Sequence, residues 1–578
     1  MYASYKEWEV KQQNMNYKII GNNDYCHIPI SIFTNRGITN VNEYTHLTDD
    51  VLIPYDNLDN INEAVQMLGK HIKSNSKMAI IVDCDVDGQC SAAMMYSYLK
   101  RLNKEIDITY LIHSGKQHGI SSEIEMPEST SLLIIPDAGS NDTEQCKQLT
   151  EQGVDVLVLD HHDVERTNPY AVIVNNQCSS EYSNKELCGA GIVYKFLQAL
   201  DDCYWNNYAD DYLDLVALAN ISDIMDLRSF ETKRLIDKGL YNVTNKCFEE
   251  FINAQNYSMK GKVNPHTIAF CITSLINAMC RVGDMEEKDL LFRAFIEQDE
   301  EFEYKKRGET ENTKENIYQR VVRLCKNAKS RQDNQVKKLL PALRKSVTND
   351  KNTVLFLKGN NIPSVFSGLI AMKMASYAKK PCLILRKDEE NNVYRGSARN
   401  FDNSYVLDLK ADLLKTGLFN WCQGHANAFG FEIKAENVAE AIKVLNKNID
   451  SDNPLPIDFC FDYGEFNIGM ISDVTSLENC YGTGIKEPLF VINNIVLEHS
   501  QGVIMGKNED TWKFITDDNI AIIKFCNPSD DKVLDFLNGY NGYDDEICIN
   551  ALCQLNVSEY KGVITPQIVI LKYEEVER

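Results

Sequence analysis

Acidic and imidazole side chains gather where three apolar runs of the sequence end. In chain order they are Asp83, Asp85 and Asp87, then Asp137, then Asp160, His161 and His162, with Asp223 further along. Carboxylates packed this densely repel one another unless cations compensate. Oxygen and imidazole donors suit manganese or magnesium better than zinc, which favours thiolate. Two such cations about 3.5 to 4 Å apart clamp phosphoryl oxygens and activate water, so the pattern predicts metal-dependent phosphodiester hydrolysis.

The first acidic cluster, residues 83–88, has other interpretations. Its Asp-x-Asp-x-Asp-Gly order also opens calcium-binding EF-hand loops, but the twelfth position holds Met94 instead of the required Glu. An aspartyl-phosphate phosphatase of the haloacid dehalogenase type would use Asp85 and Asp87, yet it leaves 160–162 unexplained. A purely structural acidic loop is a third possibility. The ordered set of clusters favours the metal centre.

The apolar runs 78–82, 132–136 and 154–159 are continuous, as buried parallel strands are. Helices are expected between them, over 90–102 and 143–152. Alternating strands and helices predict an α/β fold with a doubly wound parallel sheet. Because ligands bind at the carboxyl ends of such strands, the clusters should converge on one crevice.

The rest of the chain divides into further segments. We expect a helical extension over 1–74, the catalytic domain over 75–245, a long helical connector over 246–347, a second α/β domain over 348–450 and a small β-barrel over 451–578. Residues 314–345 hold ten Lys or Arg and two acidic residues. This basic helix is either a solvated face or a surface that tracks a nucleic-acid backbone.

Composition limits the function classes. The chain has 578 residues and a net charge of −24, which disfavours nonspecific nucleic-acid binding, although local patches and bound cations set the local field. Eighteen cysteines contain no Cys-x-x-Cys pair, which indicates reduced core thiols in a cytoplasmic protein. No run of about 18 apolar residues exists and the N-terminus is polar, so neither membrane nor secretion is predicted.

These motifs resemble the DHH phosphoesterase family, specifically its RecJ branch of single-strand-specific 5′→3′ exonucleases. The similar segments are 83–88, 137–139, the Asp-His-His triplet 160–162, 187–196, 219–227 and 276–283. The resemblance implies that Asp85, Asp87, Asp137, His161 and Asp223 bind metal, with Asp137 bridging two divalent cations. It implies that Asp83 ligates or orients a ligand and that Asp160 fixes its neighbours. His162 and Arg281 would contact the scissile phosphate, and Asn277 the substrate.

Two further segments resemble the same family. Gly396-Ser-Ala-Arg399 and Gln423–Gly430 are similar to the DHH-associated domain, which implies a 5′-phosphate receptor at Ser397 and Arg399 and backbone contacts at Gly424 and His425. Residues 481–490 are similar to the start of an OB-fold, which binds single strands. Where RecJ enzymes carry an Arg before Gly-Tyr-Gly, this chain has His113, Lys116 and His118, which we expect to bind substrate in its place.

The resemblance implies an exonuclease that degrades single-stranded DNA to 5′-mononucleotides in repair, recombination or replication. We expect a monomer, with a single-strand-binding protein or a helicase as partner. One alternative is a related enzyme for short oligonucleotides or cyclic dinucleotides. Another is a non-catalytic single-strand-binding scaffold, against which the complete ligand set argues.

Overall fold

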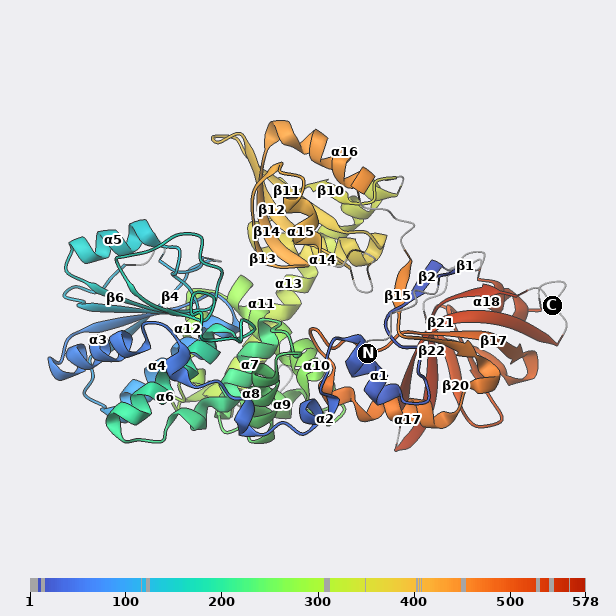
Figure 1. Ribbon diagram of the computed structural model, residues 1–578, viewed down its shortest axis with the longest axis horizontal. Coiled ribbons are helices and arrows are strands. Elements are labelled where there is room, and N and C mark those ends of the chain that lie inside the picture. The colour runs from blue at the N-terminus through green and yellow to red at the C-terminus, as the bar shows by residue number, and fades with distance from the viewer. Residues whose placement is uncertain are drawn as a thin grey trace, which may run out of the picture. The chain divides into compact units, whose positions relative to one another are not determined.

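The computed structural model describes residues 9–11, 16–115, 117–120, 125–305, 312–348, 350–401, 404, 406, 408–448, 454–525, 531–539, 545–560 and 562–576. The chain forms two compact units (Figure 1): one holds 42–334 and 479–485, and the other holds 1–41, 335–478 and 486–578. Lys116 lies outside the described residues. Within the described residues, no helix is long and apolar enough to cross a membrane.

A five-stranded parallel sheet organises the first unit, in the order β4-β3-β5-β6-β7. The strands are β3 (Met78–Val82), β4 (Ile108–Ile112), β5 (Leu132–Pro136), β6 (Asp155–Asp160) and β7 (Val172–Asn175). The strand order reverses at β3, because β4 and β5 lie on its two sides. This switch point opens a crevice at the carboxyl ends of β3 and β5, where ligands bind in such sheets. The predicted doubly wound sheet is confirmed.

Helices cover both faces of this sheet. Figure 1 shows α5 (Thr143–Glu151) on one face and α3 (Ile61–Lys73), α4 (Val86–Leu102) and α6 (Gly189–Tyr204) on the other. Buried strand residues such as Ile81, Leu133 and Val158 form the core on one face. Helix α4 begins four residues before the predicted position 90 because Asp85 caps its N-terminus.

The remainder of this unit is largely helical. Its elements are α2 (Val41–Thr45), α7 (Leu213–Ser222), α8 (Phe230–Tyr241), α9 (Lys246–Gln255), α10 (Pro265–Ile268), a π-turn (Ala269–Thr273), α11 (Ser274–Val282), α12 (Met285–Phe295), the hairpin β8 (Glu301–Tyr304) and β9 (Thr313–Asn316), and most of α13 (Ile317–Val347). Short 3₁₀ turns cover Asp49–Val51, Tyr55–Asn57 and Ala209–Tyr212. Residues 317–345 of the predicted basic segment form one helix, α13, as expected, whereas 314–316 belong to β9.

The second unit contains a mixed sheet in the order β10-β11-β12-β14-β13. Its strands are β10 (Leu355–Lys358), β11 (Cys382–Asp388), β12 (Val393–Arg399), β13 (Phe419–His425) and β14 (Ala428–Lys434), packed with α14 (Ser367–Ala378), α15 (Leu409–Leu414) and α16 (Val438–Asn448). The N-terminal extension contributes β1 (Glu9–Lys11), β2 (Asn16–Ile19) and α1 (Ile28–Asn35), and β2 pairs with β15 (Leu455–Ile457). This extension is therefore partly β-structure.

The C-terminal strands form an open sheet in the order β16-β17-β21-β22-β20-β19-β18. They are β16 (Phe459–Asp462), β17 (Phe490–Glu498), β18 (Gly502–Met505), β19 (Thr511–Ile515), β20 (Ala521–Lys524), β21 (Glu546–Tyr560) and β22 (Val563–Glu575), with helices α17 (Ile468–Ser476) and α18 (Lys532–Leu537). The predicted β-barrel is wrong for the described residues, because β16 and β18 do not pair with each other and remain the two edges. Alternating apolar positions indicate half-buried strands but do not decide whether the edges meet.

Candidate metal centre

The loop after β3 presents three carboxylates within a single turn. Asp83 directly follows the strand, Asp85 caps α4 by accepting a hydrogen bond from the Gly88 N–H at 3.1 Å, and Asp87 lies in the first helical turn. A Cβ atom at Gly88 would lie 2.5 Å from the Asp83 Cβ. Glycine is therefore required for the helix to start this close to the strand end.

Asp87 is fixed by the N-terminus of a second helix, α6. Its carboxylate accepts hydrogen bonds from the N–H groups of Gly189 at 2.7 Å and Ala190 at 2.8 Å, and from Ser91 Oγ at 3.2 Å. Helix N-termini stabilise anions because their N–H groups and dipole point outward. These donors fix the orientation of the Asp87 carboxylate.

Asp137 follows β5 in a strained backbone conformation. Its φ is 65°, which is uncommon for a residue other than glycine, and its N–H donates to Leu159 O at 2.8 Å. Gly189 packs directly against it, because a Cβ at Gly189 would lie 2.5 Å from Asp137 Oδ1. The left-handed conformation and this contact direct the Asp137 side chain into the crevice.

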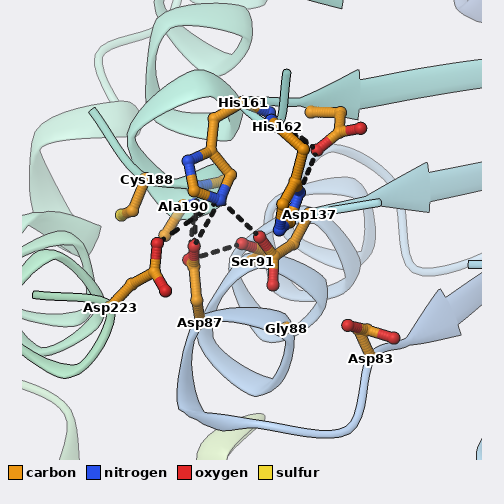
Figure 2. Close-up of polar contacts among 12 residues, drawn as sticks. Asp83, Asp87, Gly88, Ser91, Asp137, His161, His162, Cys188, Ala190 and Asp223 are labelled. Atoms are coloured by element: carbon orange, nitrogen blue, oxygen red, sulfur yellow. Dashed lines mark hydrogen bonds and ion pairs between the residues drawn. The ribbon is translucent and has the colours of Figure 1, made fainter. Parts of the chain in front are cut away.

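His161 lies among three of the carboxylates (Figure 2). Its Nε2 is 3.3 Å from Asp137 Oδ1, 3.4 Å from Asp223 Oδ2 and 3.8 Å from Asp87 Oδ2. Asp223 follows the C-terminus of α7, with its N–H bonded to Ala219 O at 2.9 Å. These side chains come from the ends of β5, β6 and α7 and from the start of α4, and they point toward a common position, which the sequence spacing alone does not show.

Asp160 is buried and is held by donors of the protein. It accepts from the backbone N–H of His161 at 2.7 Å, from Ser140 N at 3.1 Å and from His162 Nδ1 at 2.8 Å. Burial would raise the Asp160 pKa, but the two histidines and the Ser140 hydrogen bond lower it below the ordinary value. Although burial lowers the His162 pKa, the Asp160 charge raises it to about 9.

A second group of donors surrounds Asp83. His118 Nδ1 lies 2.6 Å from Asp83 Oδ2, and the buried His113 Nε2 lies 3.6 Å from Asp83 Oδ1. Lys288 of α12 fixes this region by donating to the carbonyl oxygens of His113 at 3.2 Å and Ser114 at 2.8 Å. The structure therefore places two of the three predicted substrate-binding histidines, His113 and His118, against Asp83.

The donor sets suit divalent metal ions. Ligand atoms of Asp87, His161 and Asp223 lie within 4.8 Å of one another, and so do those of Asp83, Asp85 and Asp137. Asp137 belongs to the second donor set and also contacts His161 of the first set, so it lies between the two donor sets.

The electrostatics of the donor sets also fit cations. Burial and the neighbouring carboxylates raise the Asp137 pKa well above its usual range, and burial together with Asp83 raises that of Asp85 to about 6. Asp137 Oδ1 and His161 Nε2 are buried and accept or donate no hydrogen bond among the described residues. A bound cation would relieve the repulsion and satisfy these atoms.

Arg281 and Asn277 lie on α11, which packs against α4. Burial lowers the Arg281 pKa, and the neighbouring Cys280, Asp85 and Cys84 act against this shift. Asp85 and Cys84 lie in the carboxylate loop. Asn277 precedes Arg281 by one turn, on the same side of the helix. The structure thus brings the positively charged Arg281 side chain beside the acidic crevice.

The remaining predicted residues belong to the second unit. Arg399 of β12 and His425 of β13 both pair with Ala428 of β14, so they occupy one cross-strand row. Gly424 has a φ of 121°, and a Cβ there would lie 2.9 Å from Ala428 O. Ser397 lies two residues before Arg399 on the same side of β12.

Arg399 also lies against the N-terminal turn of α14. A Cβ at Gly368 would be 2.7 Å from its Nη2 atom. The preceding Ser367 has a buried Oγ without a hydrogen-bond partner among the described residues. A guanidinium beside a helix N-terminus and an unsatisfied hydroxyl together favour an anion at this position.

Sequence reasoning missed the backbone donors Gly189 and Ala190, which hold Asp87, and Ser140, which holds Asp160. The small residues at 189–191 were a signal for close approach, but which carboxylate they would contact depends on how α6 packs against α4. Ser367 carried no sequence signal.

Comparisons with known proteins agree with this geometry. The family model described as "DHH family, N-terminal domain" matches residues 77–220. The YorK protein of Bacillus subtilis (strain 168), which derives from the SPbeta prophage and carries the name of a single-strand DNA-specific exonuclease, is 36% identical over 97% of this chain and 98% of YorK. The single-stranded-DNA-specific exonuclease RecJ of the same organism is 24% identical over 86% of this chain and 63% of RecJ.

Among solved structures, RecJ in complex with Mn²⁺ from Thermus thermophilus superposes with a TM-score of 0.69 at 17% identity. The match covers 96% of this chain and 78% of that one. At this identity the likeness shows a shared fold.

Proposed function

This chain belongs to the RecJ-like members of the DHH family, and we propose that it hydrolyses single-stranded DNA from the 5′ end to 5′-mononucleotides. The observation that carries the proposal is the buried set of carboxylates around His161, with Asp137 between two donor groups. Bound cations would satisfy its unpaired atoms and offset the repulsion between its carboxylates. The names of the RecJ-like relatives describe them as exonucleases specific for single-stranded DNA.

Two divalent cations, manganese ahead of magnesium, would occupy the two donor sets. Asp87, His161 and Asp223 would hold one, Asp83 and Asp85 the other, and Asp137 both. When bound, such cations activate water and neutralise charge on the phosphodiester. His118 and His113 would orient the Asp83 carboxylate.

Protein cations would stabilise the charge that develops on the phosphate. Asp160 orients the His162 ring and keeps it protonated at neutral pH, since the His162 pKa is about 9. Arg281 offers a guanidinium beside Asp85. Both would donate hydrogen bonds to non-bridging oxygens of the scissile phosphate, and Asn277 would contact the adjacent nucleotide.

The terminal 5′-phosphate would bind at the start of α14. Arg399 supplies a fork of N–H donors, Ser397 and Ser367 supply hydroxyls, and the helix dipole favours the anion. Gly424 and His425 would contact the strand backbone. We further propose that the protein is a monomer and that its partner is a helicase or a single-strand-binding protein. It would act in repair, recombination or replication.

The test is a digestion of single strands labelled at the 5′ or the 3′ end, with Mn²⁺ and a duplex control. A 5′ label should appear first in mononucleotides, the duplex should resist, and Asp137→Ala should abolish cleavage. Mononucleotides released first from the 3′ label would refute the direction. Cleavage of dinucleotides alone would favour a small-substrate enzyme, and no cleavage with any divalent metal would favour a binding scaffold.

The phosphate receptor has its own test. Arg399→Ala should remove the preference for a 5′-phosphorylated strand over a 5′-hydroxyl strand. Arg395→Ala is a matched control, because Arg395 lies on the same strand and pairs with Glu432 and Asp388. An unchanged preference in Arg399→Ala would exclude this residue as the receptor.

A further inference from the structure

One face of the helical run from Pro265 to Val282 is less buried than the other. Along it His266 and Phe270 are exposed, whereas Ser274, Asn277 and Arg281 are half-buried. These positions are three or four residues apart, so they form a stripe along one side of the run. The opposite side is buried, as Ile268, Ile272 and Ile276 are fully enclosed.

Phe270 is the unexpected member of this stripe. Its side chain is 69% exposed, although the isoleucines two residues to either side are fully buried. The His266 ring lies against it, with centroids 4.6 Å apart and planes at 33°. The π-turn that carries Phe270 is tied by the Ser274 hydroxyl, which donates to Phe270 O at 2.7 Å. Such π-turns are frequent at functional sites.

The other end of the stripe lies at the acidic crevice. Arg281 interacts electrostatically with Asp85 and Cys84, and α11 packs against α4. From Phe270 to Arg281 is 11 residues, or about 16 Å of helix at 1.5 Å per residue. A stacked strand rises about 3.4 Å per nucleotide, so this length corresponds to about five nucleotides, or fewer in a stretched strand.

We propose that Phe270, supported by His266, is a stacking platform for a base of the single strand whose scissile phosphate lies at the metal centre. This inference rests on the proposed nuclease function and adds a positioning residue to it. An exposed aromatic face suits any base, because every base has a π-face, and so it binds without sequence preference. Arg281 would contact the scissile phosphate, as proposed above, and Asn277 would contact the nucleotide beside it, on the way to Phe270.

The experiment compares Phe270→Ala, Phe270→Trp and Tyr241→Ala. Tyr241 is a matched control, since it is 92% exposed and lies outside the stripe, at the end of α8. Steady-state cleavage with Mn²⁺ is measured on a 5′-phosphorylated 12-nucleotide strand and on a dinucleotide. We expect Phe270→Ala to raise KM for the long strand about 10-fold with kcat unchanged, as loss of one stacked base predicts. Phe270→Trp should retain the low KM, and all variants should cleave the dinucleotide equally.

A scan of single abasic positions through the first eight nucleotides tests the same contact from the DNA side. The unmutated protein should show a raised KM at one or two internal positions, and Phe270→Ala should lose that sensitivity. If the unmutated protein degrades the strand but shows no sensitive position, or if Phe270→Ala behaves as Tyr241→Ala does, the platform is excluded while the nuclease proposal stands. If the unmutated protein does not cleave the strand, both proposals fall.

Discussion

Substitution of Gly189 by Ala should damage the metal centre more than the fold. The new Cβ would lie 2.5 Å from Asp137 Oδ1 and 2.7 Å from Asp137 Cα. Ordinary contacts begin at about 3.5 Å, so Asp137 or the start of α6 must move by about 1 Å. The same residue's N–H holds Asp87 at 2.7 Å, so any movement of α6 displaces a second ligand.

The size of the effect follows from this displacement. A misplacement of about 1 Å in an active site costs about 100-fold in rate, which corresponds to about 2.7 kcal/mol of transition-state stabilisation. Overpacking by itself destabilises a fold by about 1–3 kcal/mol. We therefore expect kcat/KM for a 5′-phosphorylated single strand to fall about 100-fold in Gly189→Ala, together with a loss of Mn²⁺-dependent thermal stabilisation.

Gly191→Ala separates these two effects. Its Cβ would lie 2.4 Å from Leu187 Cδ1, so the clash is with a side chain and involves none of the carboxylates. Both variants should lose stability on thermal unfolding with EDTA, but only Gly189→Ala should lose activity and metal response. An equal loss of activity per folded molecule in the two variants, or none in either, would refute the reasoning.

Three other substitutions test the ligand set and the fold. Asp137→Asn should raise the stability of the EDTA-treated protein at neutral pH, because burial and the neighbouring carboxylates raise the Asp137 pKa and so make its ionised form unfavourable in the folded state. It should also abolish the Mn²⁺-induced rise in Tm, and an unchanged metal response would contradict the bridging role. Arg36→Met should lower the free energy of unfolding by about 3–5 kcal/mol in urea titrations, because it leaves the buried Asp458 without its partner. A loss below about 1 kcal/mol, as is typical of exposed ion pairs, would contradict this. Asp284→Ala should cost about 1 kcal/mol, because it removes the capping box with Glu287 at the start of α12, with no effect on Mn²⁺ binding.

The parallel sheet and the clusters at its strand ends were predictable because both depend on local pattern. Continuous apolar runs, each ending in Asp, indicate buried strands whose carboxyl ends share one edge. The order Asp83 to Asp223 therefore predicted a metal centre, and the donors of Asp87, Asp137, His161 and Asp223 do meet. The C-terminal barrel was mispredicted, since strand alternation is the same in open and closed sheets.

What tertiary structure alone decided is how each ligand is held. Asp137 is directed by a left-handed backbone conformation, Asp87 by the N–H groups of α6, and Asp83 by two histidines from the loop after β4. These contacts join residues far apart in the chain, so no spacing rule predicts them. The sequence by itself determined which donors reach the crevice, because strand ends are local features, while helix packing determined their orientation and left the Phe270 face open.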